Sequence, residues 1–122
     1  MGVREVLFVF LGGGAGSVLR YAVSELCRRW PAAQAFPLGT FIVNILGSFL
    51  IGVLAGHLIK ADSSLKLLLI TGFCGGFTTF STFSAENASL LQNGNYGIAL
   101  LNMVLSLVVG LLAVMIGWKV AG

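Results

Sequence analysis

The stretch GFCGGFTTFSTF, residues 72–83, combines residue types that rarely occur together in a strongly apolar chain. It contains glycines, hydroxyl-bearing threonines and serine, and phenylalanines, and it carries no charge. Two kinds of chemistry are open to such a stretch. Backbone carbonyl oxygens that a helix no longer uses can coordinate a cation. Hydroxyl groups and the positive edges of aromatic rings can attract an anion.

The backbone of this stretch predicts an interrupted helix. Gly75 and Gly76 each weaken a helix by about 1 kcal/mol relative to alanine, and the hydroxyl groups of Thr78 and Thr79 compete for backbone partners. Unwound backbone at membrane depth is tolerated only inside protein or beside water. Its carbonyl groups can hold Na⁺ without a carboxylate, and two antiparallel copies crossing at their interruptions could surround one ion. The alternative is a kink that only lets helices cross closely.

The phenylalanines of the stretch recur at helical spacing. Phe77, Phe80 and Phe83 are three residues apart, so they share one face where the helix continues. Such a stripe is usually packing or lipid contact. The alternative is a ladder of ring edges along which a small, strongly hydrated anion passes, with selectivity set by pore width and by the placement of hydrogen-bond donors.

Other polar residues lie in apolar surroundings and need partners. Asn44 can donate and accept in an interhelical hydrogen bond or contact a ligand. Asn102 and Ser106 are one helical turn apart and form a thin polar stripe, with the same two interpretations. Arg20 is either a snorkelling side chain or a charge at a pore mouth, and Glu86 is either in an aqueous vestibule or simply solvated.

The whole composition is that of an integral membrane protein. Of the 122 residues, 57% are hydrophobic and 9% are charged, whereas a soluble domain is about a quarter charged. Helices need about 20 apolar residues to cross the hydrocarbon. We expect one all-α, four-helix transmembrane domain covering residues 1–122, with the third helix broken in mid-span. The predicted spans are residues 3–23, 38–59, 65–91 and 97–118.

The basic residues give almost no orientation signal. In a four-span chain, one side of the membrane holds four of the seven Lys and Arg residues and the other side holds three. Because Lys and Arg in short loops set orientation, this balance predicts insertion in both directions and allows an antiparallel, dual-topology homodimer. The two groups are Arg4, Lys60, Lys66 and Lys119, and Arg20, Arg28 and Arg29.

The sequence lacks the motifs that would indicate several other classes of function. No nucleophile–base set or phosphate-binding loop is present, so an enzyme is not expected, and no basic stripe suggests nucleic acid. Two alternatives to an ion channel remain. A small dual-topology multidrug or cation exporter would need a carboxylate at membrane depth, and a non-transporting membrane assembly subunit would tolerate other apolar residues at Phe80 and Phe83.

Three segments carry a resemblance to a known family. They are GGGAGSVLRY at residues 12–21, GTFIVNILGSFLIG at residues 39–52 and TGFCGGFTTFSTFS at residues 71–84. With these segments in this order, the chain resembles the Fluc family of fluoride channels, also called CrcB. The resemblance implies a multi-pass protein of the cell membrane that exports cytoplasmic fluoride passively.

The resemblance also implies an assembly and a set of roles. The assembly is an antiparallel homodimer with two fluoride pores and a structural Na⁺ at its centre. Gly75 and Thr78 would supply carbonyl ligands to Na⁺. The other implied roles are pore-lining rings from opposite protomers for Phe80 and Phe83, a pore-lining amide for Asn44, a hydroxyl track for Ser81, Thr82 and Ser84, vestibule positions for Arg20 and Glu86, and pathway positions for Asn102 and Ser106.

Overall fold

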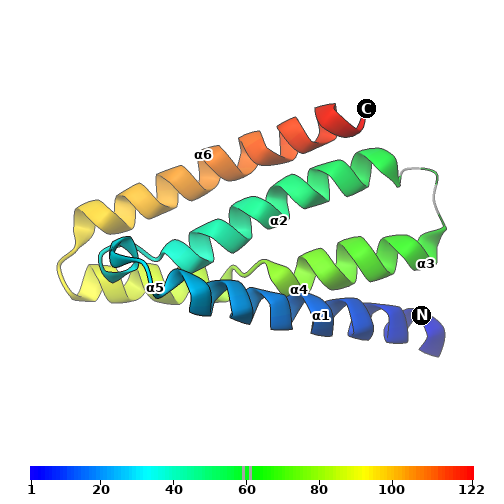
Figure 1. Ribbon diagram of the computed structural model, residues 1–122, viewed down its shortest axis with the longest axis horizontal. Coiled ribbons are helices and arrows are strands. Elements are labelled where there is room, and N and C mark those ends of the chain that lie inside the picture. Colours follow the sequence, from blue (N-terminus) through cyan, green and yellow to red (C-terminus); the bar gives the residue numbers. More distant parts are fainter. Residues whose placement is uncertain (59, 61) are drawn as a thin grey trace.

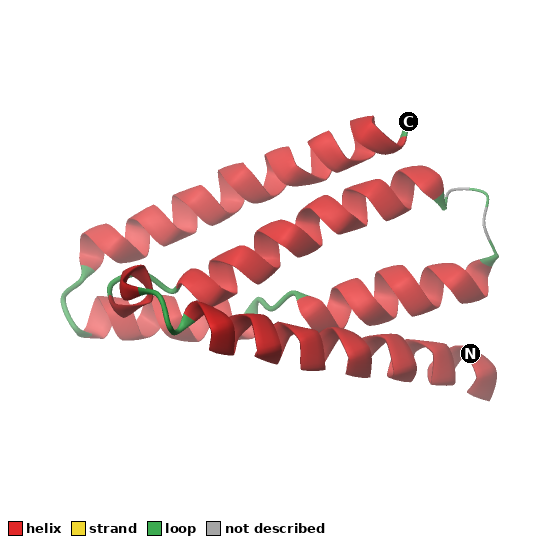
Figure 2. Ribbon diagram, viewed as in Figure 1, coloured by secondary structure: helices red, strands yellow, loops and turns green. Residues whose placement is uncertain are grey.

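The computed structural model describes residues 1–58, 60 and 62–122, and this part of the chain is helical and contains no strand. Figures 1 and 2 show the helices lying roughly side by side in one bundle. The elements are α1 (Val3–Cys27), the 3₁₀ turn η1 (Pro31–Gln34), α2 (Leu38–His57), α3 (Ser63–Lys66), the π-helical segment η2 (Leu67–Cys74), α4 (Gly75–Phe77), α5 (Ser81–Gln92) and α6 (Tyr96–Ala121).

Four helical segments are long and apolar enough to cross a membrane: α1, α2, α6 and the composite segment Ser63–Gln92, which we call the third span. This confirms the predicted all-α membrane architecture. α1 continues to Cys27, past the predicted end at residue 23, and α6 continues to Ala121. α2 ends at His57, and residue 59, where the second span was predicted to end, lies outside the described residues.

The bundle has two distinct ends. The N-terminus, the C-terminus, the end of α2 and the start of α3 lie at one end, and η1 lies at the other with the turn between α5 and α6 (Figure 1). That turn contains Gly94 with φ of 79°, a left-handed conformation that glycine adopts without steric cost. The arrangement is the one expected for successive spans of alternating direction.

Glycines allow two close helix pairs. A Cβ atom at Gly12 or Gly16 of α1 would overlap backbone of the third span, at Leu68 and Phe73 respectively. A Cβ atom at Gly117 of α6 would overlap Phe49 of α2, and one at Gly52 of α2 would overlap Val114 of α6. Close backbone approach is a main source of helix association in lipid, so α1 pairs with the third span and α2 pairs with α6.

The third span is interrupted, as predicted, but the glycines are not the site of the interruption. Gly75 is helical, with φ of −63° and ψ of −37°, whereas Thr78 is extended, with φ of −88° and ψ of 159°. Gly76 packs against the backbone of Gly13. The glycine pair therefore permits close contact with α1, and the chain unwinds at Thr78–Phe80, where a hydroxyl and a neighbouring helix offer other hydrogen bonds.

Candidate functional site

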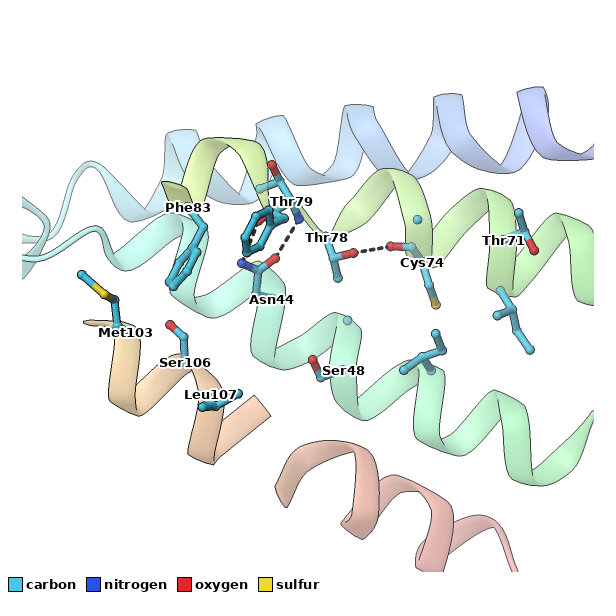
Figure 3. A pocket seen from close by; sticks show the side chains of 15 residues that line it. Asn44, Ser48, Thr71, Cys74, Thr78, Thr79, Phe83, Met103, Ser106 and Leu107 are labelled. Atoms are coloured by element: carbon cyan, nitrogen blue, oxygen red, sulfur yellow. Dashed lines mark hydrogen bonds between the residues drawn. The ribbon is translucent and has the colours of Figure 1, made fainter. Parts of the chain in front are cut away.

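An open groove of about 780 Å³ is bounded by the third span on one side and by α2 and α6 on the other (Figure 3). Its lining combines hydroxyl, amide and aromatic groups with apolar side chains and contains no charged residue. The lining residues are Asn44, Gly47, Ser48, Ile51, Ile70, Thr71, Cys74, Gly75, Thr78, Thr79, Phe80, Phe83, Met103, Ser106 and Leu107.

Asn44 of α2 holds the interrupted backbone. Its side-chain Nδ2 donates to the carbonyl oxygen of Thr79 at 3.1 Å, and its Oδ1 accepts from the Thr79 amide at 2.8 Å (Figure 3). The carboxamide thus pairs with both polar groups of one residue in the unwound segment. Because unpaired backbone groups are costly away from water, Asn44 stabilises the unwound conformation at this depth.

Two carbonyl groups of the interruption lose their helical donors. In a continuous helix the amide four residues on would donate to each carbonyl. The Thr79 amide, which would serve the Gly75 carbonyl, donates to Asn44 instead. The Thr82 amide, which would serve the Thr78 carbonyl, donates to Thr79 Oγ1 at 3.2 Å. Both residues line the groove, and their carbonyl oxygens make no hydrogen bond within the described part of the chain.

The hydroxyl of Thr78 cannot donate to a ligand in this arrangement, because its proton is already used. Thr78 Oγ1 donates to the Cys74 carbonyl at 2.8 Å, and the Thr78 amide donates to the same oxygen at 3.0 Å. The last carbonyl groups of a helix commonly need such partners. Among the polar groups of Thr78, the carbonyl is the one that makes no hydrogen bond in the described part of the chain.

The structure separates Phe77 from the other two phenylalanines of the predicted stripe, and with Phe73 the stretch forms two ring pairs. Phe73 and Phe77 stack, with ring centroids 5.8 Å apart, and Phe77 is buried. Phe80 and Phe83 line the groove, with ring centroids 6.0 Å apart and an angle of 38° between the rings. Phe80 is 79% exposed, although it lies in the middle of a membrane span. The second pair therefore offers ring surfaces that this single chain does not cover.

Arg20 of α1 reaches the broken helix. Its Nε donates to the Gly76 carbonyl oxygen at 3.0 Å, and the Ser17 hydroxyl lies 3.5 Å from the same oxygen. Positive charge is favourable at a helix C-terminus, where carbonyl groups are unpaired. Arg20 thus caps α4, and it does not line the groove.

The three residues of the predicted hydroxyl track lie at the start of α5, outside the groove lining. All three are exposed. The Ser81 hydroxyl lies 3.5 Å from Thr79 Oγ1, and the backbone of Ser84 donates to the Phe80 carbonyl at 2.9 Å. Thr82 is placed by the bond of its amide to Thr79.

A buried hydrogen-bonded chain connects α5 to the groove. Asn102 of α6 is 1% exposed, and its Nδ2 donates to Asn87 Oδ1 on α5 at 2.9 Å. Ser106 Oγ donates to Asn102 Oδ1 at 3.1 Å. Ser106 lines the groove, on the side of α6 that faces Phe83 in Figure 3, whereas Asn102 does not reach it.

Glu86 lies in a separate, smaller pocket of about 220 Å³ between α5 and η1. Its Oε1 is buried and has no hydrogen-bond partner among the described residues. The pocket is otherwise lined by Ser89, Leu90 and the segment 33–37. Glu86 and the groove are therefore distinct sites.

The groove brings together half of the residues proposed from sequence. Those that line it are Asn44, Gly75, Thr78, Phe80, Phe83 and Ser106; those that do not are Arg20, Ser81, Thr82, Ser84, Glu86 and Asn102. The sequence patterns did not single out Asn87, whose partner is 15 residues away. The available signal was a carboxamide on the segment before Asn102 in the same hairpin, but Asn93 and Asn95 lie there too, and spacing alone does not show which carboxamides meet.

Comparison with known proteins agrees with this architecture. Residues 7–118 match the family described as CrcB-like protein, Camphor Resistance (CrcB). The chain is 46% identical over 119 residues to a fluoride-specific ion channel FluC of Azobacteroides pseudotrichonymphae, covering 95% of this chain and 94% of that protein. Proteins of the same name in Bacteroides fragilis and Serratia proteamaculans are 48% and 51% identical over 121 residues, covering 94% and 93% of this chain and 94% of each relative.

Proposed function

The chain belongs to the CrcB family of membrane proteins, and on that premise we propose that it is a passive, fluoride-selective ion channel. We further propose that it works as an antiparallel homodimer with two pores and a structural Na⁺ at the dimer centre. The uncharged groove along the interrupted third span carries this proposal, because it offers polar groups and ring edges to an ion at membrane depth.

The chemistry of the groove favours a small anion. Ring edges are positive, and the hydroxyl groups of Ser48 and Thr71, which line the groove and make no hydrogen bond in the described part of the chain, can donate to an anion. The lining has no Lys or Arg to trap an anion, and conduction requires that the ion leave as easily as it enters. A fluoride ion can thus exchange part of its water for weak, spaced contacts.

The same groove argues against an exporter that exchanges protons. Such a protein needs an ionisable carboxylate on its transport path. No Asp or Glu lines the groove, and Glu86 lies in the separate pocket beside η1. For an anion, the inside-negative membrane potential alone supplies the outward driving force, at about 2.3 kcal/mol per 100 mV.

The Gly75 and Thr78 carbonyl groups fit a structural Na⁺. Both lack hydrogen-bond donors in the described chain and both line the groove, and unwound carbonyl groups are the usual Na⁺ ligands of membrane transporters. One chain contributes two such oxygens, so a second copy related by an antiparallel twofold axis would complete the set. The ion would supply a fixed positive charge that ties the two interruptions together.

Exposed aromatic surface supports the homodimer. Phe80 is 79% exposed and the groove that it lines is open. If each copy placed its Phe80 into the groove of the other, both exposed rings and both grooves would be covered. An isologous interface of this kind is closed by twofold symmetry. The near balance of basic residues between the two ends, four against three, is what allows the two copies to insert in opposite directions.

A flux measurement tests the proposed function. Purified protein is reconstituted into liposomes loaded with fluoride or chloride, and anion efflux is followed with ion-selective electrodes. We expect rapid fluoride loss without comparable chloride loss. Proton-coupled cation uptake without anion flux would identify an exporter instead, and no flux from a well-folded dimer would identify an assembly subunit.

The ring-edge mechanism has its own test in Phe80→Ile and Phe83→Ile. These substitutions keep an apolar side chain but remove the aromatic edges, so we expect fluoride efflux to fall by roughly tenfold or more while the dimer persists. Phe73→Ile is the matched control, because Phe73 stacks on Phe77 and does not line the groove. Unchanged flux in both groove variants would remove the ring-edge mechanism.

A further inference from the structure

The side chains of Asn87, Asn102 and Ser106 form a hydrogen-bonded series in which each donor and acceptor is defined. Asn87 Oδ1 accepts from Asn102 Nδ2, so Asn102 must turn its Oδ1 toward Ser106. That oxygen accepts the only proton that Ser106 can donate. The Ser106 hydroxyl therefore presents lone pairs, and no proton, to the groove that it lines.

This direction depends on Asn87. The oxygen and nitrogen of a carboxamide have nearly the same size, so packing alone does not decide which of them faces Ser106. Asn102 is 1% exposed and Asn87 is 6% exposed, so water does not compete at this pair. The choice is made by the acceptor that Asn87 offers across the α5–α6 hairpin.

We propose that Asn87 is a positioning residue that keeps the Ser106 hydroxyl from donating to an anion in the groove, and thereby keeps the anion weakly held. The inference rests on the proposed fluoride conduction. A hydroxyl that donated to fluoride at this point would add a hydrogen bond to an ionised acceptor, the strong class of such bonds. A tighter site fills at lower concentration and empties more slowly.

Loss of Asn87 should reverse the direction of the hydrogen bond between Asn102 and Ser106. In Asn87→Leu the Asn102 Nδ2 group would be left buried without an acceptor, and an orphaned buried N–H is less tolerated than an under-used carbonyl oxygen. Asn102 then turns its Nδ2 toward Ser106 Oγ. The Ser106 proton is released toward the groove, where it can donate to an anion.

The flux experiment measures how fluoride efflux saturates with fluoride concentration. We expect Asn87→Leu to lower the half-saturating concentration by roughly tenfold or more, as for one hydrogen bond to an ionised acceptor, and to lower the maximal rate. In a Ser106→Ala background, Asn87→Leu should leave the half-saturating concentration unchanged.

A second measurement does not depend on conduction. In thermal unfolding of the detergent-solubilised protein, Ser106→Ala should be more destabilising in the Asn87→Leu background than in the otherwise unaltered protein, because Asn102 then has no partner at either end. Additive effects of the two substitutions, or a shift in the half-saturating concentration that Asn87→Leu produces equally in the Ser106→Ala background, would overturn the proposal. Absence of fluoride flux in the unaltered protein would refute the proposed function, and the unfolding cycle would still decide whether Asn87 and Ser106 are coupled through Asn102.

Discussion

At the scale of single residues, the interruption is stabilised by side chains that imitate missing backbone. Asn44 pairs with the amide and the carbonyl of Thr79, Thr79 Oγ1 accepts from the Thr82 amide, and Arg20 donates to the Gly76 carbonyl. Each contact replaces a bond that a continuous helix would make internally. The carbonyl groups of Gly75 and Thr78, which no side chain serves and which belong to residues lining the groove, are the ones we assign to Na⁺.

Asn44→Leu should be strongly destabilising, because both polar groups of Thr79 lose their partner. We expect about 2–4 kcal/mol from the two unpaired groups together, measured by thermal unfolding in detergent. Ser48→Ala is the control, since Ser48 lies one turn further along α2 and lines the same groove, and its hydroxyl makes no hydrogen bond within the described chain. Equal stability of the two variants would mean that the interruption persists without the carboxamide.

At the scale of elements, glycine positions determine which helix faces are in backbone contact. Gly110 and Gly117 are both buried on α6 and both face α2, but they differ in the space available. A Cβ atom at Gly110 would meet only side-chain atoms of Ser48 and Ile45, at 3.8 and 3.9 Å, whereas one at Gly117 would overlap the Phe49 carbonyl oxygen. Sequence spacing places both on the helix and does not distinguish them.

The two glycines give a matched pair of substitutions. Gly110→Ala should be neutral or stabilising by up to about 1 kcal/mol, because alanine favours helix and the added methyl group fits. Gly117→Ala should destabilise by about 1–3 kcal/mol, since the helices must separate to admit the methyl group. Thermal unfolding of both variants in the same detergent is the measurement, and a destabilised Gly110→Ala with an unaffected Gly117→Ala would contradict the α2–α6 packing.

At the scale of the whole molecule, one chain leaves its interrupted backbone and the groove beside it uncovered at membrane depth. The groove is open, and Phe80 projects beside it. Unwound backbone facing lipid is not tolerated, so the open face requires a cover. A second copy in the opposite orientation is the cover that we propose, and it would bring its own Gly75 and Thr78 carbonyl groups to the same centre.

Gly75→Ala distinguishes the dimer from the fold of one chain. No atom of the described chain lies within 4 Å of a Cβ atom built at Gly75, so the substitution should leave the folded protomer intact. We expect it to crowd the second copy, raising the dimer dissociation constant by roughly tenfold or more. Size-exclusion chromatography with light scattering and fluoride efflux are the two measurements.

Gly14→Ala is the control for that experiment, because a Cβ atom at Gly14 also meets nothing within 4 Å, and α1 contributes no residue to the groove lining. A Gly75→Ala protein that dimerises and conducts as well as Gly14→Ala does would show that the second copy does not pack against this face.

The sequence by itself determined the broad architecture. Hydropathy runs of membrane-spanning length specify four apolar helices because the bilayer leaves a backbone few alternatives. The threonine pair indicated that the third span is interrupted, because hydroxyl groups compete locally for backbone partners, whereas the glycine pair remains helical. The close spacing of Phe80 and Phe83 likewise anticipated that both would line one surface.

Only the tertiary structure decided where the helix unwinds and which polar groups reach the groove. The interruption falls at Thr78–Phe80 because Asn44, 35 residues earlier, offers a second set of backbone partners there, while α1 holds Gly76 in helical packing. Asn102 turns away from the groove because Asn87 accepts its proton. Such choices depend on hydrogen bonds between distant segments, and no local pattern encodes which of several possible partners a buried polar group will meet.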